Sequence, residues 1–206
     1  MIKRTTGRFL LTVLVITGLA GTLNNSSLSP KERKQAINLI KNSRKEVLNS
    51  ISGLSLHQLK YKLSSKESSI AELITKIALK EKTFSDQVSL AMDQPANPEI
   101  RLKIALTDEQ LLANDDYNLC KLEIAPETKM TIKDKDPEEA IRKFNELQTD
   151  HIKYIRTSTE DLRNHVVRTS VGWIDCYQYF LLMADQNYFV AERINKIRSL
   201  PRFPKK

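Results

Sequence analysis

The chain has 206 residues, 40% of them hydrophobic, and a formal net charge of +8 at pH 7. This length suits a single globular domain, and the small numbers of glycine (5) and proline (7) favour long helices over a turn-rich β fold. Lysines alternate with acidic residues, and no basic stripe with stacking aromatics is present, which argues against nucleic-acid binding. A weak attraction to anionic membrane surfaces stays open.

The first twenty residues have the pattern of a targeting segment. Residues 1–8 are basic, residues 9–20 are almost entirely apolar, and Gly18 and Ala20 suit the −3 and −1 positions of a cleavage site. We expect a secretory signal peptide over 1–20 and a linker over 21–29, and therefore export to the periplasm or the outside of the cell. An uncleaved N-terminal anchor is the alternative, although the run is shorter than the ~20 residues of a membrane span.

Two helices are predicted in the first half of the chain. Ser29, Pro30 and Glu32 form the pattern of a capped helix start, and Gly53 ends that helix. A second helix begins near residues 68–69 and stops at the proline-containing segment 94–98. Its apolar stripe consists of Ile70, Leu73, Ile74, Ile77, Phe84, Val88 and Ala91.

The second half begins with an irregular stretch. Residues 99–135 are predicted to form a long crossover with a short helix near 108–113, as a bundle with parallel second and third helices requires. A third helix starts at Asp136 and Pro137 and carries His151 on its apolar face. A fourth, central helix is predicted from about 171 to 199. Cys120 and Cys176 lack metal-site spacing, and we favour two unpaired thiols over a disulfide.

Several segments together resemble the DinB-like family. The similar segments are Ser69–Leu73 (SIAEL), Asp161–His165 (DLRNH), Gly172–Gln178 (GWIDCYQ), Arg193–Ile194, and Pro201–Pro204 (PRFP). The resemblance covers about residues 30–204. It implies an all-α, four-helix bundle of the up-up-down-down type, with a long crossover between helices two and three, and often a homodimer.

The metal-binding residues of that family are absent from this sequence. Family members hold a divalent metal with three histidines, and the matching positions here are Lys76, Gln186 and Val190. An ammonium repels a cation, an amide is a weak ligand, and an isopropyl group has no lone pair. We therefore expect no metal and no other cofactor.

Two functions remain after this loss. The first is a non-catalytic, metal-free module that binds a small molecule or a protein, at a pocket around the three altered positions with His151, His165 and Asp185 near its wall. The alternative is a transferase or hydrolase whose altered site uses His151, His165 or Lys76, converging near Gln186.

Lys76 itself has two interpretations. It could pair with an acid such as Asp185 or Glu192 and hold the bundle together, or extend to solvent from the edge of the apolar stripe.

Overall fold

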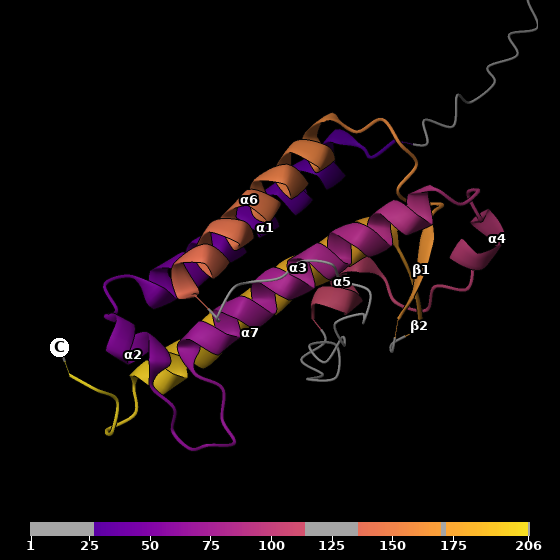
Figure 1. The fold of residues 1–206 in the computed structure, drawn as a ribbon. Coiled ribbons are helices and arrows are strands. Elements are labelled where there is room, and N and C mark those ends of the chain that lie inside the picture. Colours follow the sequence, from indigo (N-terminus) through magenta and orange to yellow (C-terminus); the bar gives the residue numbers. More distant parts are fainter. Residues whose placement is uncertain (1–26, 114–135, 170–171, 206) are drawn as a thin grey trace, which may run out of the picture.

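The computed structural model describes residues 27–113, 136–169 and 172–205. It is mostly helical (66% helix), and the described residues form seven helices and one small sheet (Figure 1). Among these residues, no helix combines the length and the apolar character that a membrane span needs. The expected signal peptide, most of the linker and Cys120 lie outside the described residues.

Four helices are long and the others are short. The long helices are α1 (Pro30–Ile51), α3 (Ile70–Met92), α6 (Pro137–Thr157) and α7 (Cys176–Arg198). The short ones are α2 (Leu56–Lys60), α4 (Pro98–Arg101) and α5 (Asp108–Leu112), and the strands are β1 (Val166–Thr169) and β2 (Gly172–Asp175).

The predicted helix starts are confirmed by their caps. The Ser29 hydroxyl accepts from the Glu32 amide, and the Glu32 carboxylate accepts from the Ser29 amide at 2.7 Å. Ser69 and Glu72 close the same reciprocal box at α3. These contacts satisfy backbone amides that have no partner within the helix, so the helices begin where the sequence pattern placed them.

The predicted start of the fourth helix is wrong by five residues. Residues 172–175 form β2, which pairs antiparallel with β1 and places buried Val167 opposite buried Ile174. Gly172 has φ +104°, a backbone conformation outside the helical region. The helix begins only after Asp175, whose carboxylate accepts from the Gln178 amide at 2.7 Å.

The long helices pack in a ring in which each contacts two others. Helix α1 packs against α6 and α7, and α3 packs against the same two. Arg33 near the start of α1 donates to the carbonyl of Ile155 near the end of α6, so α1 and α6 run antiparallel. Arg198 at the end of α7 donates to Ser50 at the end of α1, so α1 and α7 run parallel.

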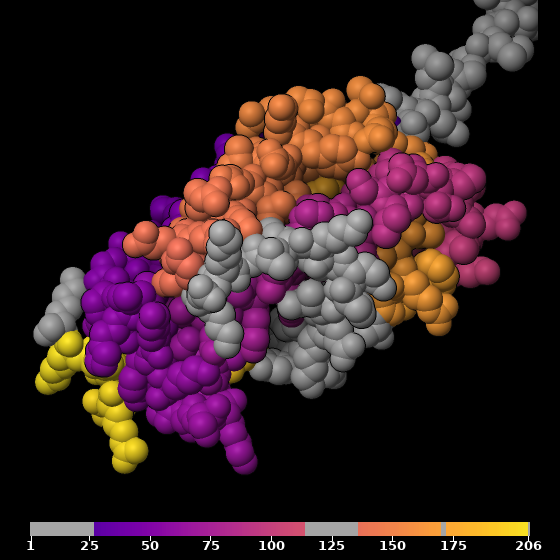
Figure 2. Space-filling view, viewed as in Figure 1, coloured from indigo at the N-terminus to yellow at the C-terminus, as the bar shows by residue number. Residues whose placement is uncertain are grey.

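The direction of α3 corrects the expected up-up-down-down order. Arg193 near the end of α7 bonds to Glu67, just before α3, so α3 runs antiparallel to α7 and hence to α1. Helices α3 and α6 run parallel, as the long crossover predicted, and their surfaces adjoin on the face shown in Figure 2. The first and last long helices therefore point one way, and the middle two point the other way.

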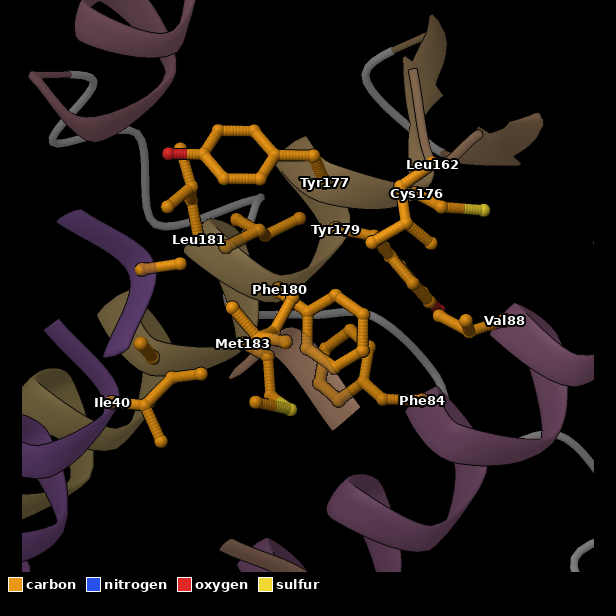
Figure 3. Packing of buried hydrophobic residues seen from close by; sticks show 14 of the residues in the cluster. Ile40, Phe84, Val88, Leu162, Cys176, Tyr177, Tyr179, Phe180, Leu181 and Met183 are labelled. Atoms are coloured by element: carbon orange, nitrogen blue, oxygen red, sulfur yellow. The ribbon is translucent and has the colours of Figure 1, made fainter. Parts of the chain in front are cut away.

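The core consists of two hydrophobic clusters, one towards each end of the long helices. The cluster nearer the start of α7 includes Phe84, Tyr179 and Phe180, whose side chains lie together in Figure 3. Phe84 and Tyr179 meet edge to face with ring centroids 4.5 Å apart. The other cluster contains Val47, Leu59, Ile70, Ala71, Leu73, Ile74, Ile77, Ala78, Ala140, Phe144, Ala191 and Ile194.

Arg163 ties together the end of the molecule where α1 and α7 begin. Its guanidinium contacts the carboxylates of Glu32 at 2.7 Å, Asp108 at 2.6 Å and Asp175 at 2.9 Å. The guanidinium carbon also lies 4.1 Å from the centre of the Tyr177 ring. One side chain thus links α1, α5 and the N-cap of α7.

Candidate functional site

A layer of buried polar side chains separates the two hydrophobic clusters, and each long helix contributes to it. The contributors are Ser43 from α1, Glu81 from α3, Gln148 and His151 from α6, and Gln186 and Asn187 from α7. In each helix these positions fall between residues of one cluster and residues of the other. Burial of polar groups is costly unless they are paired, so the pairing inside this layer is informative.

Three residues of this layer and the half-buried Ser85 of α3 form a continuous chain. The Asn187 amide donates to Oε1 of Glu81 at 2.8 Å, and Oε2 of Glu81 lies 3.1 Å from Nδ1 of His151. Nε2 of His151 lies 2.7 Å from the Ser85 hydroxyl oxygen. Glu81 and His151 are 1% and 5% exposed, so the chain runs from the core towards the surface between α3 and α6.

The contact between Glu81 and His151 is close without being linear. The pair lies within ion-pairing distance, yet neither Oε2 nor Nδ1 has an aligned hydrogen bond. The side-chain amide of Gln148, one turn before His151 and fully buried, has no hydrogen-bond partner among the described residues. Some polar atoms of this layer therefore have no hydrogen-bond partner, which is rare in the interior of a native protein.

The chain ends at a pocket of about 300 Å³ between α3, α6 and α7. Ser85 and His151 lie in its wall, beside the apolar side chains of Val88, Met92 and Phe180. Concave, mostly apolar sites with a few convergent polar groups are the usual form of small-molecule sites.

The rim of this pocket is acidic. Asp93, Asp150 and Glu160 line it, and none of its lining residues is a lysine or arginine. Both α3 and α6 end close by, and helix C-termini carry partial negative charge. Tyr154 donates to Glu160 at 2.6 Å, and burial together with this bond raises the pKa of Tyr154, so the phenol keeps its proton. The local field favours neutral or cationic ligands although the whole chain is basic.

A larger hollow of about 780 Å³ along α6 is a less suitable site. It is an open surface groove of mixed charge, and Arg44 crosses it to bond with Asn145 at 2.9 Å and Thr149 at 3.2 Å. An open groove spanned by a side chain that is already bonded encloses a ligand poorly.

The three positions that match the family's metal ligands are not brought together as a pocket. Lys76 is exposed and donates to the Ser68 hydroxyl at 2.8 Å. Gln186 is buried in the polar layer, and Val190 is half-buried against the second hydrophobic cluster. Neither of the two hollows described above is lined by any of them, so the expected pocket at these positions stays a prediction.

The three residues predicted to line that pocket lie in different places. His151 lies in the wall of the pocket of about 300 Å³, which is not the pocket expected at Lys76, Gln186 and Val190. His165 instead lies 2.7 Å from the carbonyl of Asp161 and 3.0 Å from that of Gln94, and it fixes a loop. Asp185 is half-buried on α7 and lines neither hollow. The alternative in which His151, His165 and Lys76 converge near Gln186 is therefore not supported.

The donor chemistry at the altered positions does not fit a divalent metal. An ammonium, an amide and an isopropyl group cannot replace three imidazoles, and the ammonium faces away towards Ser68. Among the described residues, no three His, Cys, Asp or Glu side chains form a group that could hold a metal ion. We derive no chemistry through a metal.

Cys176 offers no reactive thiol. It is fully buried at the start of α7, and burial, with the nearby Asp175 and Glu160, raises the pKa of its thiol to about 12. A thiol that stays protonated is a poor nucleophile.

Comparison with known proteins found no relative of this chain. No family model, no curated protein and no solved structure matches the chain. The site therefore has to be interpreted from its own geometry.

Sequence reasoning missed Glu81, Ser85 and Asn187. Glu81 follows Ile77 by four residues and precedes Phe84 by three, so it occupies a position of the apolar stripe. A carboxylate at a stripe position was the available signal for a buried polar contact.

Proposed function

We propose that the chain is a DinB-like four-helix bundle that works as a metal-independent binding module for a small organic molecule. The ligand enters the pocket between α3, α6 and α7. The observation that carries the proposal is the pocket itself, a partly open hollow with an apolar wall, an acidic rim and His151 among its lining residues. The ring of four long helices supports the bundle, with α1 and α7 pointing one way and α3 and α6 the other.

The lining predicts what kind of molecule binds. Val88, Met92 and Phe180 offer an apolar wall, and the carboxylates at the rim repel an anion. The ligand is therefore expected to have an apolar body and a neutral or cationic head. A hollow of about 300 Å³ suits a compact molecule with one ring or a short chain.

Calorimetry with three matched probes tests this function. Phenethylamine, phenethyl alcohol and phenylacetate share a ring and differ mainly in the charge of the head group. We expect the amine to bind most tightly, the alcohol more weakly and the acid not measurably, because of the acidic rim. Treatment with EDTA should leave the affinities unchanged if no metal takes part.

A pair of charge reversals separates the pocket from the overall charge. Asp150→Lys alters the rim, whereas Glu99→Lys makes the same change at an exposed site on α4. The first should weaken amine binding several-fold, and the second should leave it within error. Equal effects, or equal affinities for the three probes, would contradict the proposed site.

A further inference from the structure

The chain of contacts that ends at the pocket brings a serine hydroxyl into direct contact with a histidine, and a buried carboxylate lies close behind that histidine. We propose that Ser85 is a nucleophile that accepts an acyl group from a carboxylic ester bound in the pocket, with His151 as general base and Glu81 as its positioning residue. The inference rests on the proposed function because the same pocket must first hold the ester. It adds a metal-independent covalent step to the binding role.

The distances place nucleophile and base in direct contact. The Ser85 oxygen lies 2.7 Å from Nε2 of His151, within the range of a hydroxyl that donates to an imidazole. Both residues line the pocket, so an ester there meets the pair without further movement of the backbone. The Ser85 oxygen also lies 3.0 Å from the backbone carbonyl of Glu81, an alternative acceptor for its proton.

Glu81 is the group that positions the His151 ring. Its Oε2 lies 3.1 Å from Nδ1, close to the ring although no aligned hydrogen bond joins the two atoms. The proposed reaction uses the tautomer that carries its proton on Nδ1 and keeps the lone pair of Nε2 for Ser85. The carboxylate is almost fully buried and is itself held by Asn187 through Oε1. Base, orienting carboxylate and supporting amide thus come from α6, α3 and α7.

The acyl transfer balances without a co-reactant other than water. As the Ser85 oxygen attacks the ester carbonyl carbon, its proton moves to Nε2 of His151. The bond to the alcohol oxygen then breaks, and the alcohol leaves with that proton. Water repeats the sequence on the acyl group, giving the carboxylic acid and free Ser85. The acidic rim favours neutral or cationic esters over esters that carry a second carboxylate.

The site has little to stabilise an oxyanion. Ser85 lies inside α3, where backbone amides bond to carbonyls one turn earlier and are not available. Ser89 lies one turn beyond Ser85 and lines the same pocket, so its hydroxyl is a candidate donor. Activated substrates should therefore acylate readily, and turnover of ordinary esters should be slow.

Labelling with an uncharged hexyl fluorophosphonate tests the nucleophile in the full chain. In the expected reaction the Ser85 oxygen bonds to phosphorus, fluoride leaves, and the proton goes to His151. Mass spectrometry should find one phosphonyl group, on the peptide that contains Ser85. His151→Gln should slow labelling by about 100-fold, the effect of losing a general base.

Three further variants separate the roles of nucleophile and positioning residue. Ser85→Ala should abolish labelling. Ser50→Ala, at a buried helical serine that donates to the carbonyl of Val47, should label like the wild type. Glu81→Gln should lower the maximal labelling rate at least tenfold while the half-saturating probe concentration stays the same. A merely structural defect would instead change both values or the melting temperature.

The labelling and calorimetry results together distinguish failure of the nucleophile from failure of the binding function. An unlabelled wild type, or equal labelling of wild type and Ser85→Ala, would overturn the nucleophile. If phenethylamine still binds the unlabelled protein in calorimetry, only the acyl transfer fails and the binding function stands. If no probe binds, both proposals fail together.

Discussion

Arg163 shows how a single residue can hold three elements together. Its guanidinium is the cation shared by the carboxylates of Glu32, Asp108 and Asp175. Burial raises the pKa of Asp175, partly offset by Arg163. Burial also tends to raise the pKa of Glu32. Hydrogen bonds from Ser29 and Arg163 have a larger opposite effect, so the pKa of Glu32 lies below its usual value. The cluster depends on its one positive charge.

Replacement of Arg163 by methionine should destabilise the protein strongly. We expect a loss of roughly 3 kcal/mol in the free energy of unfolding at pH 7, since three close carboxylates would be left without a cation. Urea titration measures it. Without Arg163 the carboxyls bind protons at higher pH, so the folded variant takes up more protons than the wild type as pH falls. The difference in stability should therefore shrink towards pH 4.

Lys76→Met is the matched control for that loss. Lys76 is an exposed cation whose ammonium bonds to Ser68 and not to Asp185 or Glu192. Its replacement should change stability by no more than about 0.5 kcal/mol. Equal losses in the two variants, or a deficit in Arg163→Met that grows at acid pH, would contradict the account of the cluster.

Single residues were the hardest part of the site to predict. The sequence showed His151 on an apolar face but not which groups would meet it. Ser85 and Glu81 lie 66 and 70 positions earlier in the chain, so their approach to His151 depends on how α3 and α6 pack. The resemblance directed attention to Lys76, whose side chain turns out to face solvent.

Helix starts could be predicted wherever a cap and an apolar stripe agree. Ser29, Ser69, Thr107 and Asp136 all cap helices near the predicted positions. The start of α7 was misplaced because Trp173 and Ile174 suit a helix core as well as a strand. The capping pair Asp175 and Gln178, and Gly172 before it, were the signals that outweighed this pattern.

The cap of α3 should contribute measurably to stability. Ser69→Ala removes the hydroxyl that accepts from the Glu72 amide, and we expect a loss of about 1 kcal/mol in urea titrations. Ser68→Ala changes the neighbouring serine, which bonds only to an exposed lysine, and should cost much less. A larger loss at Ser68 than at Ser69 would show that the helix does not begin at this cap.

The directions of the helices belong to the whole molecule and were only partly predictable. The long crossover indicated parallel middle helices, and α3 and α6 confirm this. The up-up-down-down order expected from the resemblance is not observed, because each capping box fixes where a helix begins but not which neighbour it packs against. The directions follow from contacts between distant segments, such as Arg33 with Ile155 and Arg198 with Ser50.

The most direct test of the binding site uses the three histidines of the chain as reporters. His57 is exposed on α2, His165 holds a loop, and His151 lies in the pocket wall. Imidazole ¹H–¹⁵N NMR spectra would be recorded while phenethylamine is added. We expect the His151 signals to shift in a saturable way while those of His57 and His165 stay in place. Saturable binding that leaves His151 unmoved, or moves either of the other two instead, would contradict the proposed binding site.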